Sequence, residues 1–145
     1  MKKFFAFAIV VLTVLGTASC RKNNLSGEKE VLDIVGVWEL SAIDITKAAT
    51  LGDETVNVYV DFAPDNTFTL YQLLGEGRYS VYTGSWTLSG DYLFGNYSDG
   101  SNWASSYTIT VSKVALVLTT SDGSQITTYR RIDEVPASVF ENIKY

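Results

Sequence analysis

The sequence contains no histidine and only one cysteine, and these two shortages exclude much of the chemistry that enzymes use. A single cysteine cannot form an intramolecular disulfide. Zinc sites built from histidine and cysteine need several such ligands, so none can form here. Nucleophilic sites of the Ser-His-Asp and Cys-His types need a histidine base and are excluded as well. We therefore expect no enzyme, no cofactor and no metal site.

Positive charge is also scarce, with 11 Lys and Arg residues against 16 Asp and Glu residues. Loss of the first nineteen residues would remove Lys2 and Lys3 but no acid, which leaves 9 basic residues and a net charge of −7. An acidic domain repels phosphate backbones, so we expect no nucleic-acid partner. No basic cluster is present to hold anionic lipid heads.

The N-terminus has the three parts of a secretory signal. A basic start is followed by an apolar run at residues 4–15, which is short of the roughly 20 residues that cross a bilayer. Small residues then precede Cys20. This end resembles the lipobox of bacterial lipoproteins through Ala18, Ser19 and Cys20, with Thr17 where leucine is usual. The resemblance implies a diacylglycerol thioether and an acyl chain on Cys20, which would anchor the chain to a membrane.

We therefore expect three regions: a signal peptide at 1–19, a lipidated cysteine with a flexible tether at 20–34, and one domain at 35–145. The first tether residues, 21–24, are basic or neutral, which favours the periplasmic side of the outer membrane. An ordinary signal peptide in which Cys20 has no role is the alternative.

From residue 35 onward, short β-branched and aromatic segments alternate with turn residues, which is typical of an all-β domain. Such spacing predicts a sandwich or a barrel, and a barrel leaves no exposed edge. Pro136 is expected to begin a short C-terminal helix. Residues 84–88 either continue the strand before them, giving eight strands, or stand alone, giving nine. The expected strand segments are 36–45, 55–62, 67–73, 78–82, 84–88, 92–97, 103–112, 114–120 and 125–132.

Three stretches of the domain carry a family resemblance. Gly36-Val37-Trp38 resembles the Gly-x-Trp element of lipocalins. Residues 62–68 (FAPDNTF) and 84–88 (GSWTL) are similar to stretches of lipocalin-like domains in lipoproteins of Bacteroides-type bacteria. The resemblance covers residues 35–135 and implies an eight-stranded antiparallel barrel with a short C-terminal helix. Lipocalins use disulfides and a longer chain, which this chain lacks, so the barrel is expected to be narrow and either hollow or filled by side chains.

The same resemblance implies roles at one end of the barrel. In lipocalins the tryptophan of the first strand plugs the closed end, and a basic residue from the last strand packs over it. Trp38 is the matching tryptophan, and Arg130 and Arg131 are the two candidates for the basic residue. If Ile126 points inward, so does Arg130; if Tyr129 points inward, so does Arg131.

One segment is a candidate binding surface. Residues 92–103 are rich in aromatic and amide side chains, and Tyr92, Phe94, Tyr97 and Trp103 are the candidate contacts. Such a loop stacks on sugar rings or covers the mouth of a barrel. The alternative is a long hairpin whose aromatic residues belong to the core or form cross-strand pairs.

The acidic residues allow two further interpretations. Asp61 and Asp65 flank a turn, and a glycosidase needs two such acids facing each other across a cleft. Asp91, Asp99 and Asp122 carry the oxygen ligands that calcium prefers, although no dense calcium loop is present. In both cases the alternative is a solvated acid that forms a turn.

These observations predict a membrane-anchored, non-enzymatic binder of a small, mainly apolar ligand. The anchor is the lipid on Cys20, and the expected location is the outer membrane. Two other functions remain open: a structural or interaction protein whose filled barrel docks an envelope partner, and a carbohydrate-binding accessory module.

Overall fold

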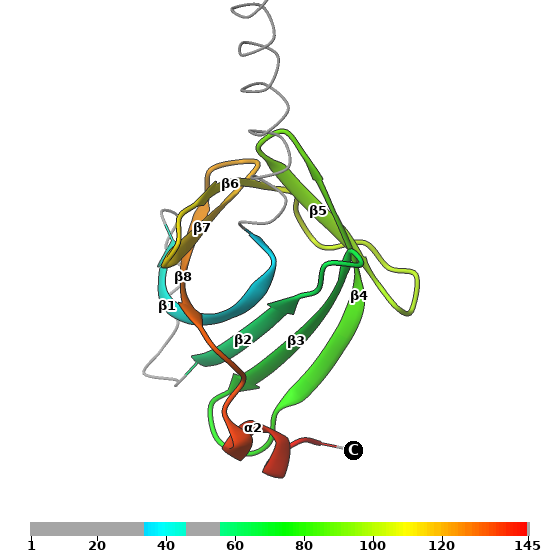
Figure 1. Cartoon of the computed structure of the whole chain (residues 1–145), viewed down its shortest axis with the longest axis vertical. Helices are drawn as coiled ribbons and strands as arrows, with labels where there is room; N and C mark the ends of the chain where they lie inside the picture. The colour runs from blue at the N-terminus through cyan, green and yellow to red at the C-terminus, as the bar shows by residue number, and fades with distance from the viewer. Residues whose placement is uncertain (1–33, 46–55, 145) are drawn as a thin grey trace, which may run out of the picture. The chain divides into compact units, whose positions relative to one another are not determined.

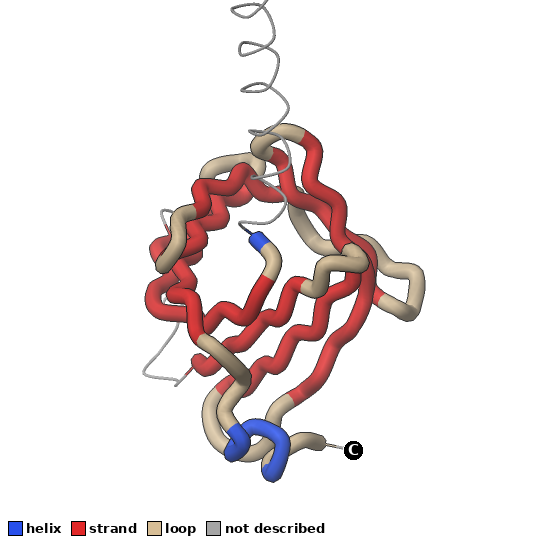
Figure 2. The backbone as a smooth tube through the Cα atoms, in the orientation of Figure 1, coloured by secondary structure: helices blue, strands red, loops and turns tan. Residues whose placement is uncertain are grey.

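The computed structural model describes residues 34–45 and 56–144, which form a closed barrel of antiparallel strands with one short helix (Figures 1 and 2). The predicted signal at 1–19, Cys20 and most of the predicted tether lie outside the described residues. In the part that is described, no helix is long and apolar enough to cross a membrane. The elements are β1 (Gly36–Ile45), β2 (Val56–Phe62), β3 (Thr67–Leu74), β4 (Ser80–Ser89), β5 (Tyr92–Tyr97), β6 (Tyr107–Val111), β7 (Ala115–Thr120), β8 (Gln125–Ile132) and α2 (Ala137–Glu141).

The predicted eight-stranded barrel with a C-terminal helix is confirmed. Each strand pairs with the next along the chain, and β1 pairs with β8 to close the ring. Residues 84–88 continue β4 rather than forming a ninth strand. Gly84 marks a close approach there, because a Cβ at this position would collide with the Asn96 carbonyl oxygen and lie 2.8 Å from the Phe68 ring.

Alternation of side chains along each strand separates the interior from the outer surface. In β2, Val58, Val60 and Phe62 are buried inside. In β1 the pairing with β8 shifts at a bulge between Leu40 and Ala42. The extra residue changes the phase of the strand, so Leu40 and Ile43 both face the interior although they are three positions apart.

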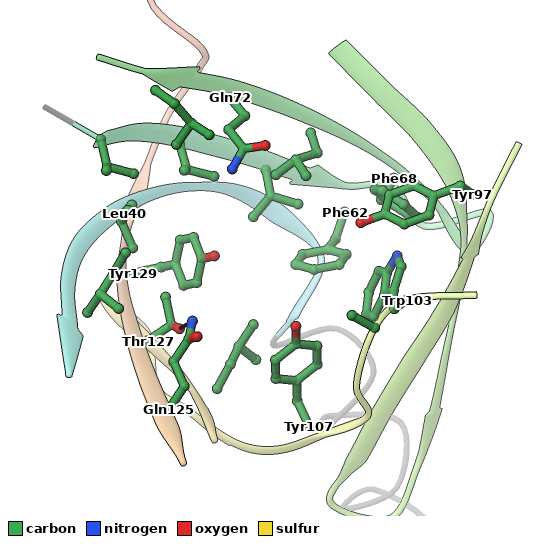
Figure 3. Close-up of a pocket in the computed structure, with 18 residues that line it drawn as sticks. Leu40, Phe62, Phe68, Gln72, Tyr97, Trp103, Tyr107, Gln125, Thr127 and Tyr129 are labelled. Atoms are coloured by element: carbon green, nitrogen blue, oxygen red, sulfur yellow. Dashed lines mark hydrogen bonds between the residues drawn. The ribbon is translucent and has the colours of Figure 1, made fainter. Parts of the chain in front are cut away.

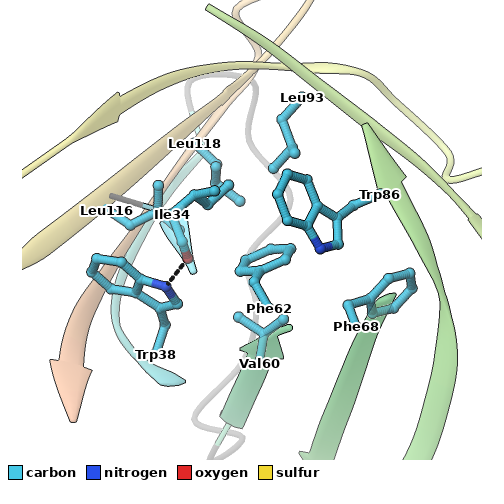
Figure 4. Close-up of a cluster of buried hydrophobic side chains, with 9 residues drawn as sticks. All are labelled: Ile34, Trp38, Val60, Phe62, Phe68, Trp86, Leu93, Leu116 and Leu118. Atoms are coloured by element: carbon cyan, nitrogen blue, oxygen red, sulfur yellow. Dashed lines mark hydrogen bonds between the residues drawn. The ribbon is translucent and has the colours of Figure 1, made fainter. Parts of the chain in front are cut away.

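The main core fills one end of the barrel (Figure 4). Its largest members, Trp38 and Trp86, are almost completely buried, and Phe62 packs edge-on against Trp86 with ring centroids 5.8 Å apart. Ile34, which the sequence placed in the tether, is fully buried here. The folded domain therefore includes Ile34. The buried members of this core are Ile34, Trp38, Val60, Phe62, Phe68, Trp86, Leu93, Leu116 and Leu118.

A second, smaller core lies on the outer surface, where α2 packs outside the ring of strands (Figure 1). Val139 of the helix is buried with Tyr59, Tyr79 and Val135. The chain after the helix is fixed to the start of β4, because Tyr79 exchanges backbone hydrogen bonds with residues 142 and 144 at 2.8 and 2.9 Å. The helix thus covers a wall of the barrel and leaves the interior to the strands.

Candidate functional site

The interior of the barrel contains a cavity of about 430 Å³ beside the main core (Figure 3). Val60, Phe62, Phe68 and Leu118 belong to both the core and the cavity lining, so they form the floor of the cavity. The cavity extends toward the other end of the barrel, where Val56 begins β2, Leu74 ends β3 and Gln125 begins β8. One end of the barrel is therefore filled and the other is hollow.

Most of the cavity wall is apolar. Its aliphatic part comes mainly from the first three strands. β2 and β3 contribute every second side chain to the interior, and β1 contributes Leu40 and Ile43 on either side of its bulge. None of the 18 lining residues within 34–45 and 56–144 carries a charge. The described aliphatic residues of the lining are Leu40, Ile43, Val56, Val58, Val60, Leu70, Leu74, Ala104 and Leu118.

The polar groups of the cavity are neutral and gather mainly on one side. Tyr97 ends β5, Tyr107 begins β6 and Tyr129 lies in β8, and their hydroxyl groups point into the same space (Figure 3). Gln125 donates from Nε2 to Oγ1 of Thr127 at 3.1 Å, so this amide is held against the wall of β8. Gln72 adds a second amide from β3.

The three tyrosines remain protonated over an extended pH range. Burial raises the pKa of Tyr129 most strongly, and the nearby Tyr107 and Tyr97 raise it further. Burial and Tyr97 raise the pKa of Tyr107, and burial is also the main cause that raises the pKa of Tyr97. Each phenol therefore serves as a neutral hydrogen-bonding group at neutral pH.

The closed end of the barrel is built around Trp38. Its Nε1 donates to the carbonyl oxygen of Ile34 at 2.8 Å (Figure 4). The guanidinium carbon of Arg131 lies 4.1 Å from the centroid of the Trp38 ring, within the range of a cation–π contact. Arg131 also donates to the carbonyl oxygens of Val35 at 2.8 Å and Lys113 at 3.0 Å. These contacts tie the start of β1 to the end of β8.

A family model described as a lipocalin-like domain matches residues 34–118. This chain belongs to the lipocalin-like domain family. No curated protein matches the sequence. The matched stretch begins at the buried Ile34 and ends in β7, so β8 and α2 of this lipocalin-like domain lie beyond it. A barrel of this family with a cavity has the capacity to hold a ligand.

The two candidate arginines of the lipocalin-like domain point in opposite directions. Tyr129 lines the cavity, so alternation along β8 places Arg131 inside, over Trp38. Arg130 points outward and forms an ion pair with Glu39 across the β1–β8 pair, with 67% of its side chain exposed. The sequence could not separate the two because the phase of this strand was ambiguous.

The four aromatic residues of the candidate loop do not form one surface. Tyr97 and Trp103 line the cavity, whereas Tyr92 and Phe94 point outward with 57% and 43% exposure. The reason is that residues 92–97 form a strand, β5, whose alternate positions face opposite sides. The segment from Trp103 to Ser106 was expected to be strand, but β6 begins only at Tyr107.

Trp103 is held at the wall of the barrel by its backbone and its ring. Its N–H donates to the carbonyl oxygen of Gly95 at 2.9 Å, and its ring lies 5.1 Å from Phe68 and 6.0 Å from Tyr107, edge-on in both cases. Gly95 makes room for it, because a Cβ there would lie 2.6 Å from the Trp103 ring and from the Ser85 carbonyl oxygen. The segment before β6 therefore closes the wall between β5 and β6, where only two residue pairs are in register.

Residues that the sequence did not single out complete the cavity. Tyr107, Tyr129, Gln72 and Gln125 lie on strands rather than in a loop. The signal for Tyr107 was its phase, since it alternates with the apolar positions 109 and 111. A polar residue that occupies the same face of a strand as the buried apolar residues is therefore the sequence signal that indicates a cavity contact.

The acidic residues that the structure describes are not part of the cavity lining. Asp65 accepts hydrogen bonds from the backbone N–H of Thr67 at 3.0 Å and from the Thr67 hydroxyl at 2.6 Å, and these bonds lower the pKa of Asp65. Asp99 accepts the equivalent two bonds from Ser101, and they lower the pKa of Asp99. Asp122 accepts from Ser124 in the hairpin turn. These acids form turns. Among residues 34–45 and 56–144, no group of three or more acids, histidines or cysteines is placed to hold a metal.

Proposed function

We propose that this lipocalin-like domain binds a small, mainly apolar ligand in its barrel and performs no catalysis. The observation that carries the proposal is the 430 Å³ cavity with its largely aliphatic lining. Its volume lies within the range of about 300–1,000 Å³ that is typical of small-molecule sites. Burial of apolar ligand surface there gains about 25 cal/mol per Å².

The titratable groups of the lining support binding rather than catalysis. Among the described lining residues they are the three tyrosines, whose raised pKa values keep them neutral and make them poor bases near pH 7. The alternative of a barrel filled by side chains is not favoured, since the cavity is open space. Docking of an envelope partner would have to use the outer surface, where Tyr92 and Phe94 are exposed. A sugar-stacking function loses support because Tyr97 and Trp103 face the cavity.

A binding titration with a cavity-filling variant tests the proposal. N-phenyl-1-naphthylamine, an uncharged apolar fluorophore, should bind the purified protein with increased emission. Val58→Phe places a ring in the cavity and should abolish this binding, whereas Asn57→Phe places the same ring on the other side of β2 and should not. If both variants bind the fluorophore like the original protein, the cavity is not the binding site.

We also propose that a lipid on Cys20 tethers the domain to the periplasmic face of the outer membrane. The proposal is supported by the apolar N-terminal run and by the small residues before Cys20. In cells that process lipoproteins, Cys20→Ala should move the protein from the membrane fraction to the soluble fraction. Unchanged membrane association of the variant would contradict the lipid anchor.

A further inference from the structure

The cavity has two chemically different sides, and this asymmetry restricts what can occupy it. The side formed by β1, β2 and β3 is mainly aliphatic, with Gln72 as its polar member. The facing side carries the hydroxyl groups of Tyr97, Tyr107 and Tyr129, which point toward the centre of the cavity (Figure 3). A ligand that satisfies both sides must have an apolar body and a polar edge.

The phenol hydroxyls have hydrogen-bonding capacity to spare. Among the described residues, no side-chain hydrogen bond joins any of the three hydroxyl groups to a neighbour. Since no fully buried side-chain oxygen in this part of the chain lacks a partner, the three hydroxyl groups are open to the cavity space. A phenol O–H is a good donor to a carbonyl or ether oxygen. The three phenol hydroxyls can therefore donate hydrogen bonds to acceptor atoms of a ligand.

The described part of the cavity lining carries no charge, and this separates neutral ligands from ionic ones. A carboxylate or an ammonium group that enters this cavity loses its hydration, and none of the 18 lining residues offers an opposite charge. The net negative charge of the protein adds to the penalty for an anion. Neutral acceptors avoid both penalties.

The volume limits the size of the ligand. A water molecule occupies about 30 Å³ in the liquid, and a methylene group is of similar size, so 430 Å³ accommodates about 14 non-hydrogen atoms of an aliphatic chain and a few more of a compact aromatic ring system. This corresponds to a medium-length chain or a small ring system rather than a full phospholipid.

We propose that the occupant of the barrel is an uncharged amphiphile with an aliphatic body and one or two oxygen acceptors, such as an ester or a ketone, held by the hydroxyls of Tyr97, Tyr107 and Tyr129. The aliphatic body lies against β1–β3 and the oxygen atoms face β5, β6 and β8. This inference rests on the proposed binding function and specifies the chemical class that the cavity selects.

Competition with matched probes tests the selection. Methyl undecanoate, dodecanoic acid and dodecylamine have similar chain lengths, and at neutral pH they are respectively neutral, anionic and cationic. Each compound is titrated, below its aggregation concentration, into the full protein with N-phenyl-1-naphthylamine bound, and the loss of fluorescence measures how well it competes. We expect the ester to compete at least tenfold better than either ion, because each ion enters the cavity without a partner.

Removal of single hydroxyl groups tests the placement. Tyr129→Phe and Tyr107→Phe should each weaken methyl undecanoate about fivefold, the effect of one neutral hydrogen bond, and leave the fluorophore unchanged. Tyr71→Phe is the matched control, since Tyr71 packs on the outer surface against Phe140 and should alter neither ligand.

The outcomes separate this inference from the proposed function. If the fluorophore does not bind, or binds equally to Val58→Phe, the binding function itself is refuted. If it binds in the cavity but dodecanoate competes as well as the ester, the selection for neutral ligands is refuted. If the ester is preferred but neither Tyr→Phe variant weakens it, the role of the phenol side is refuted.

Discussion

Gly36→Ala is the substitution that most directly tests the closed end of the barrel. Gly36 has a φ of +132°, a backbone conformation that residues with a side chain rarely adopt. A Cβ at this position would also lie 2.6 Å from Nη1 of Arg131. The methyl group therefore strains the backbone and displaces the guanidinium that packs over Trp38.

The two effects can be estimated separately. The backbone strain amounts to about 1–3 kcal/mol. Displacement of Arg131 weakens its hydrogen bond to the Val35 carbonyl and its contact with Trp38, and because the guanidinium is partly exposed we expect a further loss of about 1–3 kcal/mol. The free energy of unfolding should thus fall by about 2–6 kcal/mol in total.

Gly77→Ala provides the control for strain alone. Gly77 has a φ of +122°, close to that of Gly36, and a Cβ there would meet nothing within 4 Å. Urea unfolding of both variants, followed by circular dichroism, should show a larger loss for Gly36→Ala. In a protein that already carries Arg131→Met, the excess should largely disappear. Equal losses for the two glycines, or an excess that persists without the guanidinium, would refute the contact with Arg131 as its cause.

Three further predictions concern other parts of the barrel. Arg130→Ala should lower the free energy of unfolding by less than about 1 kcal/mol, and by still less at high salt, because the ion pair between Arg130 and Glu39 is exposed. Arg131→Ala should lower the free energy of unfolding by more than Arg130→Ala does. Urea unfolding of both variants at two salt concentrations measures these differences. Burial raises the pKa of Asp61, so the folded protein holds a proton on this carboxyl group at pH values where the unfolded chain has lost it, and the free energy of unfolding falls as the pH rises from the ordinary Asp value through the raised one. Asp61→Asn should therefore stabilise the protein at neutral pH more than at pH 3. An equal effect at both pH values would contradict this explanation. Gly95→Ala should destabilise the fold by about 1–3 kcal/mol and expose Trp103, because the new methyl group meets the Trp103 ring and the Ser85 carbonyl oxygen. Acrylamide quenching of tryptophan emission should therefore rise. Unchanged quenching would show that the neighbouring strands accommodate the methyl group without moving Trp103.

The fold was predictable where local pattern and global structure agree. Regular alternation in β2 and the Asp-Gly turn before β8 are local signals, and both strands form as expected. The segment from Trp103 to Ser106 was misjudged because aromatic and small polar residues fit a strand as well as a loop. The bulge in β1 has no clear signal, since Ser41 is as acceptable in a regular strand as in a bulge.

The site was harder to predict because tyrosine suits either side of a strand. Its ring packs in a core and its hydroxyl tolerates water, so the sequence alone did not place Tyr129 or Tyr107 inside. Hollowness depends on the sum of side-chain volumes around the whole ring, which no single segment encodes. The phase of β8 became certain only through its pairing with β1, and that pairing also decided between Arg130 and Arg131.

The contact between Arg131 and Val35 joins residues that are 96 positions apart. Because β1 closes the ring by pairing with β8, the barrel cannot close until the chain through Ile132 is available. Until then the sheet has two open edges that can recruit other chains. Any expression fragment that stops short of Ile132 should therefore aggregate rather than fold.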